Sequence, residues 1–277
     1  MKKLGERYRT ALVTGASGGL GRAFADMLLD EGLRVWGTAR DPGRIAARPG
    51  LETLRLDLAD PASVAEAFAA ADAASGGLDI VVNNAGYGLF GPFAGRDFAD
   101  WRRQVDAMLT QTMQLAHLAL PGMGRRGRGA LVNVASMAAE FPLPFMSGYN
   151  AVKAGMAGFS ESLMVEVAGS GVLIIDFRPG DYRTGFNDTM QREPGHLSTQ
   201  EPEAVRRRRV WGVLDANLRA APPPERAAAD LRRALRRGRS CTVRSGGFFQ
   251  AGLAPWLARF APLRLRRAVA ARYFGSY

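Results

Sequence analysis

Cysteine and histidine are scarce in this sequence of 277 residues. Cys241 is the only cysteine, so an intramolecular disulfide is excluded and a reducing compartment fits best. His117 and His196 are the only histidines, too few and too isolated in the sequence to form a zinc site. We therefore expect neither a disulfide framework nor a metal site.

Long hydrophobic runs are also missing. No stretch approaches the roughly 18 uninterrupted apolar residues that are typical of a membrane-spanning helix. Two lysines stand near the N-terminus, but polar residues follow them where a signal peptide would have its apolar segment. These absences predict a cytoplasmic protein, and the length suits one large domain or two small ones.

Positive charge is concentrated in the last third of the chain. Residues 190–277 contain 18 arginines and 6 acidic residues, a balance of +12, whereas residues 1–189 have a balance of −1. The arginines cluster at 206–210 and 231–239. Such clusters can bind nucleic acid, but no aromatic residues are interleaved with them in a recognisable binding motif. We therefore predict a solvated helix face and no nucleic-acid partner.

Short apolar segments alternate with helical patterns up to Gly180. The predicted strands lie at 9–15, 33–40, 51–60, 78–86, 129–136 and 171–180. Helical patterns lie at 20–32, from Pro61, from Phe98 to about Leu120, and around Tyr149. Continuous apolar strands that alternate with helices indicate an α/β fold with a doubly wound parallel sheet.

The regular alternation fades after Gly180, although a last strand is predicted at 241–244. We predict that residues 1–190 form a dinucleotide-binding and catalytic core. Residues 191–277 would add a substrate loop, this last strand and a basic C-terminal helical extension to the same single domain.

A glycine-rich loop joins the first predicted strand to the first predicted helix. Its sequence is TGASGGLG, residues 14–21, with glycines at 15, 19 and 21 that permit a tight turn and a close backbone approach. The helix that begins near Leu20 offers unpaired N–H groups and a positive dipole end to a pyrophosphate. In this position, the loop indicates dinucleotide binding.

Arg40 stands at the end of the second predicted strand, where the adenosine ribose lies in dinucleotide-binding folds. An acidic residue there would bind the 2′-hydroxyl of NAD and repel the 2′-phosphate of NADP. A guanidinium instead suits a phosphate through its fork geometry and permanent charge, and Ser17 stands in the glycine loop. The pattern favours NADP, unless Arg40 is simply one more arginine among many.

Lys153 is one of only three lysines, and the other two are Lys2 and Lys3. On a helix, Tyr149 and Lys153 lie on the same face because they are four residues apart. An ammonium beside a phenol favours the phenolate and lowers the tyrosine pKa from its usual value of about 10. This pair would exchange protons near neutral pH, although the same spacing also occurs on ordinary surface helices.

Several segments together resemble the short-chain dehydrogenase/reductase family. They are TGASGGLG, NNAG at 83–86, Ser136 thirteen residues before Tyr149, YNAVK at 149–153 and RPGDYRT at 178–184. They follow the family's order and spacing over residues 9–190. The segments LETLRLDLAD, NAGYGLFGPF and SESL are also similar to its branch of 17β-hydroxysteroid and retinol dehydrogenases. The resemblance implies a Rossmann-type fold and a nicotinamide-dependent oxidoreductase, which we expect to be a homo-oligomer.

The resemblance also implies roles for individual residues. Tyr149 would protonate the carbonyl oxygen during hydride delivery, and Ser136 would hydrogen-bond that oxygen. Lys153 would lower the Tyr149 pKa and hold the nicotinamide ribose, two tasks for which a planar guanidinium is a poor substitute. The predicted cofactor-binding residues are Gly15, Ser17, Gly19, Leu20, Gly21, Arg40, Asp57, Leu58, Asn84, Ala85, Gly86, Tyr149, Lys153, Pro179, Gly180 and Thr184.

Met108 departs from the family pattern. The family usually has an asparagine at this place, thirteen residues before Pro121. Methionine cannot hydrogen-bond the water that relays protons to the lysine. Three hypotheses therefore stay open: an NADP-dependent reductase, an enzyme that uses Ser-Tyr-Lys for dehydration, isomerisation or cyclisation, and a nucleotide-sensing protein without turnover.

We predict the first of these, a ketoreductase acting on a small hydrophobic substrate. Apolar stretches at 87–93, at 140–146 and after Gly180 would form its pocket, unless they only pack the rim of the sheet. The segment 252–275 mixes apolar and arginine positions. We expect it to cap the substrate cleft or a dimer neighbour, although such a segment could also rest on an anionic membrane.

Overall fold

A computed structural model describes residues 3–192, 201–247 and 249–275 of the chain, so His196 lies outside the described residues. The main sheet is parallel, with the strand order β3-β2-β1-β4-β6-β7-β9. Its strands are β1 (Thr10–Thr14), β2 (Arg34–Ala39), β3 (Leu51–Arg55), β4 (Ile80–Asn83), β6 (Gly129–Val134), β7 (Val172–Pro179) and β9 (Cys241–Ser245). The predicted doubly wound parallel sheet is confirmed, and its order reverses between β1 and β4, where such folds bind ligands.

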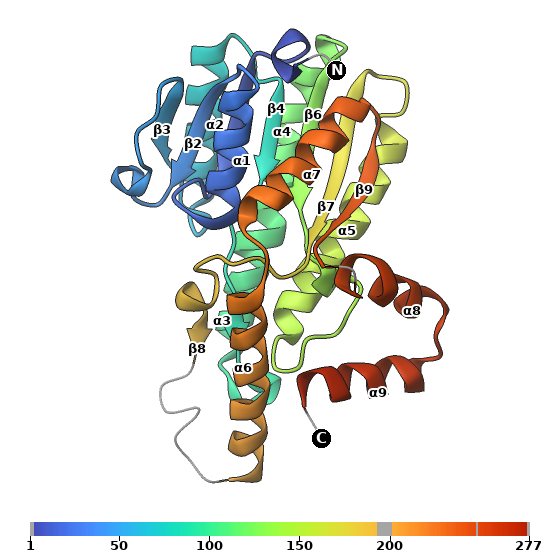
Figure 1. Cartoon of the computed structure of the whole chain (residues 1–277). Coiled ribbons are helices and arrows are strands. Elements are labelled where there is room, and N and C mark those ends of the chain that lie inside the picture. Colours follow the sequence, from blue (N-terminus) through green and yellow to red (C-terminus); the bar gives the residue numbers. More distant parts are fainter. Residues whose placement is uncertain (1–2, 193–200, 248, 276–277) are drawn as a thin grey trace.

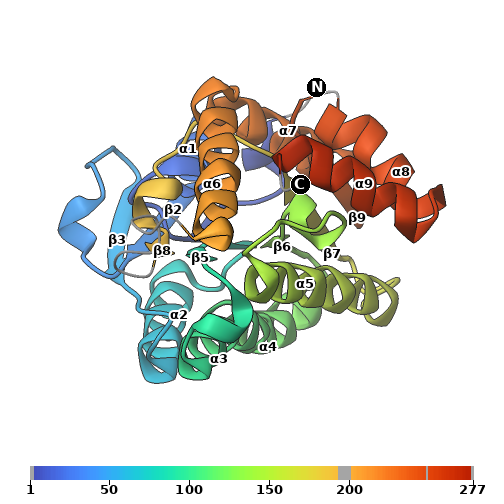
Figure 2. The same ribbon diagram turned by 90° about the horizontal axis from the view of Figure 1, so that it is seen from below.

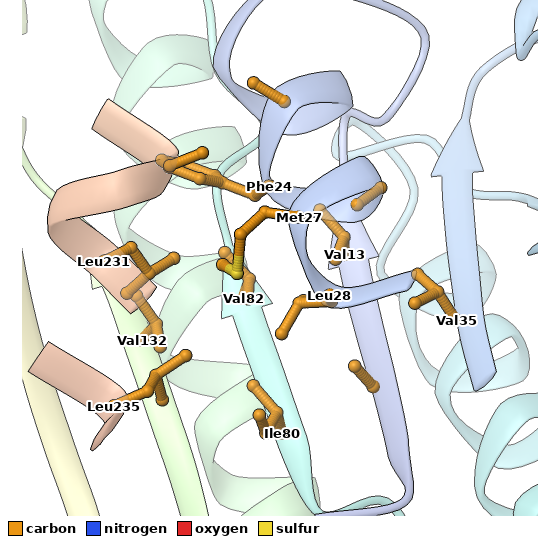
Figure 3. Packing of buried hydrophobic residues seen from close by; sticks show 14 of the residues in the cluster. Val13, Phe24, Met27, Leu28, Val35, Ile80, Val82, Val132, Leu231 and Leu235 are labelled. Carbon is orange, nitrogen blue, oxygen red and sulfur yellow. The ribbon is translucent and has the colours of Figure 1, made fainter. Parts of the chain in front are cut away.

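Helices cover both faces of the sheet (Figure 2). One face carries α1 (Gly19–Asp30) and α7 (Pro224–Arg237), and the other carries α2 (Pro61–Ser75), α4 (Gln111–Arg125) and α5 (Ser147–Glu166). Phe24 and Met27 of α1 meet Leu231 of α7 over Val82 of the sheet (Figure 3). Burial of these side chains on both faces explains why the strands read as continuous apolar runs.

Local signals set the helix ends. Asp60 caps α2 by accepting a hydrogen bond from the Ala62 backbone N–H at 3.0 Å, and Pro61 occupies the first turn. Gly76 ends the same helix in the left-handed region, with φ of 70°. This helix begins where the sequence predicts it.

The expected loss of regularity after Gly180 is wrong, because two long helices occur there. The first is α6 (Pro202–Ala220), and the second is α7, whose Leu231 and Leu235 are buried against the sheet layer. Arg233 and Arg237 of α7 are exposed, and Arg236 donates to the Glu31 carboxylate at 2.7 Å. The second arginine cluster therefore lies on the outer face of an amphipathic helix, as predicted.

A second layer of elements lies beyond the carboxyl ends of the strands (Figure 1). It contains α3 (Phe98–Val105), α6, α8 (Ala254–Phe260), α9 (Leu263–Phe274) and a small parallel pair of β5 (Leu89–Phe90) with β8 (Gln191–Arg192). Within the described residues, no helix is long and apolar enough to cross a membrane. Residues of α3, α6, β8 and α9 line a cavity over the strand ends.

Candidate active site

The glycine loop follows β1, and its conformation brings the backbone of Gly21 close to that of Gly15. Gly15 and Gly19 have φ of 71° and 53°, in the left-handed region that glycine tolerates. A Cβ on Gly21 would lie 2.1 Å from the carbonyl oxygen of Gly15, so only glycine fits there. No side chain caps the start of α1, which leaves its N–H groups available to a phosphate.

The NNAG segment is tied to the end of β1 by Thr14. The backbone N–H groups of Asn84 and Ala85 each donate to Thr14 Oγ1 at 2.9 Å. Asn84 Nδ2 donates to the Thr14 carbonyl oxygen, also at 2.9 Å. These bonds hold the carboxyl ends of β1 and β4 side by side, with the glycine loop above them.

Tyr149 and Lys153 occupy successive turns of α5, and both side chains are buried. Lys153 Nζ donates to the Val134 carbonyl oxygen of β6 at 2.7 Å and lies 5.7 Å from the centre of the Tyr149 ring. Ser136 follows β6 and forms a hydrogen bond with Tyr149. The structure thus brings the three predicted catalytic residues together.

Burial shifts the pKa values of Tyr149 and Lys153 in directions that the sequence does not predict. It raises the pKa of Tyr149 to about 12, although the hydrogen bond with Ser136 opposes the rise. It lowers the pKa of Lys153 to about 7, although the charge of Asp176 opposes the fall. The expectation that Lys153 brings the Tyr149 pKa below about 10 is therefore wrong here, because the loss of hydration is the largest influence on the pKa of the phenol.

A single cavity of about 1460 Å³ extends over the carboxyl ends of the strands. All predicted catalytic and cofactor-binding residues line it except Gly21, which instead packs against the glycine loop. Ser17, Arg40 and Asp57 lie at one end, together with Arg44, which the sequence analysis missed. Arg44 carries no motif signal, since only the turn after β2 brings it beside Arg40.

Comparisons with known proteins agree with this geometry. A family profile described as short chain dehydrogenase matches residues 9–195. The chain belongs to the short-chain dehydrogenase family. The predicted family and the general class of oxidoreductase are therefore confirmed, whereas the comparisons leave open the branch of 17β-hydroxysteroid and retinol dehydrogenases and the choice between NAD and NADP.

Two curated relatives of this short-chain dehydrogenase are reductases. It is 30% identical over 177 residues to a 3-ketodihydrosphingosine reductase of Bacteroides thetaiotaomicron, a match that covers 64% of this chain and 65% of that protein. It is 32% identical over 190 residues to a 3-oxoacyl-(acyl-carrier-protein) reductase FabG of Vibrio cholerae, covering 67% and 78%. A crystal structure of a short-chain dehydrogenase from Streptomyces avermitilis matches 97% of this chain and 96% of that chain, with a TM-score of 0.79 and 28% identity.

Asn150 of this short-chain dehydrogenase fixes the loop before α5, and the sequence analysis missed it. Its Oδ1 accepts from the Leu143 backbone N–H at 3.0 Å, and its Nδ2 donates to the carbonyl oxygens of Ala138 and Phe141, both at 2.6 Å. One side chain thus holds a loop that also lines the cavity. Its place beside Tyr149 in YNAVK was the only available signal.

Met108 lies in a π-helical segment, Asp106–Thr110, between α3 and α4. The sequence predicts one uninterrupted helix from Phe98 to about Leu120, so the π-helical turn is a correction, and the helical stretch continues to Arg125. Met108 is 1% exposed, and its sulfur accepts from the Tyr87 backbone N–H at 3.5 Å. A distorted helix is therefore present at this position without an asparagine.

A row of buried polar side chains extends across the sheet from β4 to β7, beneath α5. Asn83, Asn133 and Asp176 are partners in register, so they point to the same face of the sheet. Asn83 Nδ2 donates to Asn133 Oδ1 at 2.8 Å, and Asn133 Nδ2 donates to Ser160 Oγ of α5 at 2.9 Å. The Asp176 carboxylate therefore lies below the helix that carries Lys153, and its charge favours the protonated lysine.

We expect kcat/KM of this oxidoreductase in the reductive direction to fall as the pH rises through about 7. The pKa of Lys153 is lowered to about 7 by burial, so its charge is lost above that pH, whereas Tyr149 keeps its proton. The lost ammonium would otherwise stabilise the phenolate that forms when Tyr149 releases its proton. A pH–rate profile between about pH 6 and 9 measures this effect, and a flat profile contradicts it.

The far end of the cavity is mostly apolar. Its walls include Leu143, Met146, Phe186, Met190, Leu214, Phe249, Tyr273 and Phe274. Two of these residues belong to α9, so the C-terminal segment covers the cleft, as the favoured interpretation predicts. Trp256 and Leu263 on the outside of the same segment are 58% and 60% exposed.

Proposed function

We propose that this short-chain dehydrogenase reduces hydrophobic ketones with NADPH. The observation that carries the proposal is the continuity of one cavity, which extends from Arg40 at the nucleotide end to Tyr149 and an apolar wall. The residues present fit a dinucleotide, because the glycine loop leaves uncapped N–H groups at the start of α1. The reductase relatives support the direction of the reaction.

NADPH supplies the hydride when it is bound, and the chain supplies the proton. Ser136 positions the carbonyl oxygen by a hydrogen bond, and the Tyr149 phenol donates its proton to that oxygen. The Lys153 ammonium stabilises the resulting phenolate and is held in place by the Val134 carbonyl oxygen. Apolar side chains beside this group lower the local polarity and so strengthen these electrostatic interactions.

The proposed preference for NADP rests on Arg40 and Arg44. Both are exposed and line the nucleotide end of the cavity, and neither forms a salt bridge among the described residues. Ser17 lines the same end. Two available guanidinium groups and a hydroxyl suit a 2′-phosphate better than a 2′-hydroxyl.

We expect Arg40→Asp to weaken NADPH binding by about 10- to 100-fold and to leave NADH binding unchanged or improved, because a charge-assisted contact to the 2′-phosphate is lost. Titration of nicotinamide fluorescence measures both affinities. Arg125→Asp is the control, since Arg125 is exposed at the end of α4 and does not line the cavity. Equal NADPH affinity in Arg40→Asp and the control would show that the 2′-phosphate binds elsewhere.

Ketone reduction itself is tested with a panel of apolar ketones of increasing size, following the absorbance of NADPH. We expect turnover that increases from short to longer ketones, because the cavity walls beyond Tyr149 are apolar. Absence of turnover with every ketone, together with intact NADPH binding, would favour non-redox use of the Ser-Tyr-Lys group.

We also propose that the protein is a homo-oligomer. Met113 on α4 and Val165 on α5 are 44% and 77% exposed on the outer side of neighbouring helices. A second copy of the chain could cover them. Light scattering tests this proposal, and a monomer at micromolar concentration would contradict it.

A further inference from the structure

Asp181 brings a carboxylate to the catalytic end of the cavity. It follows Pro179 and Gly180 at the end of β7 and lines the cavity together with Tyr149 and Tyr273. Its negative charge adds to the rise in pKa that burial causes in both tyrosines, so the carboxylate acts on both phenols. An acidic group thus stands where the surrounding wall is otherwise mainly apolar.

Gln250 holds this carboxylate in a defined position. Its Nε2 donates to Asp181 Oδ2, and its Oε1 accepts from the Asp181 backbone N–H at 2.9 Å. The preceding Gly180 N–H donates to the Ser245 carbonyl oxygen of β9 at 2.7 Å. A residue held on both sides is preorganised to bind a ligand without a further loss of conformational freedom.

No positive charge in the described part of the chain neutralises Asp181. Lys153, the cationic group nearest the reaction centre, donates to the Val134 carbonyl oxygen and interacts with Asp176. Arg178 is paired with Asp176, Glu140 and Glu161. Burial raises the pKa of Asp181, and only the hydrogen bond from Gln250 opposes the rise. A cation placed beside it would relieve this cost.

Aromatic rings also line the cavity that contains Asp181. Phe249 and Tyr273 stack with their ring centres 5.5 Å apart, and Phe186 lies 5.8 Å from the Tyr149 ring. All of them line the cavity. A carboxylate among aromatic rings is a combination that binds ammonium groups, through a charge-assisted hydrogen bond and the ring quadrupole.

We propose that Asp181 binds an ammonium group of the substrate, so that the ketones reduced by this protein carry an amine close to the carbonyl and an apolar chain. The inference rests on the proposed function, because it assigns the substrate class of the same site. The other aspartates that line the cavity are placed differently: Asp41 and Asp57 lie at the nucleotide end, and Asp106 and Asp188 are exposed.

The kinetic test compares three ketones of equal chain length: one with a vicinal amine, its N-acetyl derivative and the plain ketone. We expect the wild-type protein to prefer the charged ketone by about 10- to 100-fold in kcat/KM. In Asp181→Asn this preference should disappear, because kcat/KM for the charged ketone falls to the level of the plain and acetylated ketones in the same variant. Asp188→Asn is the control with the same change of charge and should keep the preference.

A preference that survives in Asp181→Asn, or equal use of the charged and acetylated ketones by the wild type, overturns the inference. An equal loss with all three ketones in Asp181→Asn also overturns it, because that result indicates only a structural role.

Calorimetry separates this inference from the proposed function. A medium-chain vicinal amino alcohol is titrated into the protein with NADP present, and the N-acetyl derivative is the comparison. We expect the amine to bind the wild type at least about tenfold more tightly than it binds Asp181→Asn. Amine binding without any ketone turnover would contradict the reductase assignment alone, whereas turnover of plain ketones without amine binding would contradict the role of Asp181 alone.

Discussion

Tyr149→Phe is expected to lower kcat for ketone reduction by about 100- to 10,000-fold, because it removes the group that donates a proton to the carbonyl oxygen. NADPH affinity should stay within about threefold of wild type, since the ring remains and the phenol acts mainly in proton transfer. Steady-state rates and nicotinamide fluorescence measure the two effects separately.

Tyr8→Phe is the matched control for this substitution. Tyr8 is completely buried, its hydroxyl has no hydrogen-bond partner among the described residues, and it does not line the cavity. Its loss should leave kcat unchanged. A Tyr149→Phe variant that keeps activity within a few-fold of this control would remove Tyr149 from the mechanism.

Lys153→Met is expected to reduce kcat by about 100-fold or more and also to weaken NADPH binding, because in the proposed mechanism one ammonium would both stabilise the phenolate and hold the nicotinamide ribose. The variant should fold, since an apolar side chain replaces a buried cation that has no salt bridge among the described residues. Thermal unfolding checks the fold, and the kinetic and binding assays check the two losses.

Lys153→Arg keeps the positive charge but replaces the compact ammonium with a larger, planar guanidinium. The space around the ammonium is defined by the Val134 carbonyl oxygen at 2.7 Å and the Met156 sulfur at 3.7 Å. A planar guanidinium is too large for this site, so we expect activity to remain low. Restored activity in Lys153→Arg would mean that only the charge matters, and unchanged NADPH affinity in Lys153→Met would contradict the role in ribose binding.

The sequence predicts those features that depend on short-range chemistry. Gly15 and Gly19 require conformations that few other residues tolerate, so their spacing reveals the loop and the helix that follows. The four-residue interval between Tyr149 and Lys153 places both on one helix face. The alternation of apolar strands and helices similarly reveals the parallel sheet.

Features that depend on tertiary packing could not be predicted. The pKa values of Tyr149 and Lys153 are set by burial, and a sequence does not show how much water each side chain loses. The π-helical turn at Met108 has no marker in the sequence equivalent to a proline or a cap. Asp181 is recognisable as a site residue only after Gln250, 69 positions away, is seen to hold it.

The bounds of the two long helices after Gly180 were not predicted, for a different reason. In α6, arginines fill all four positions at 206–209, and only Ala204 and Val210 are buried. Its apolar pattern is therefore too sparse to indicate a helix face. The helix α7 has such a face, but the prolines at 222–224 suggest an irregular segment although Pro224 begins the helix.

The most direct test of the central claim is transfer of a labelled hydride. NADPH with both hydrogens at C4 of the nicotinamide ring replaced by deuterium is incubated with the protein and a hydrophobic ketone, and the product is analysed by mass spectrometry and NMR. We predict an alcohol with one deuterium on the former carbonyl carbon and none on the hydroxyl, with the label absent when Tyr149→Phe is used. Product without deuterium, or a converted substrate that remains at the same oxidation level, would contradict a reductase and support non-redox acid–base chemistry in this site.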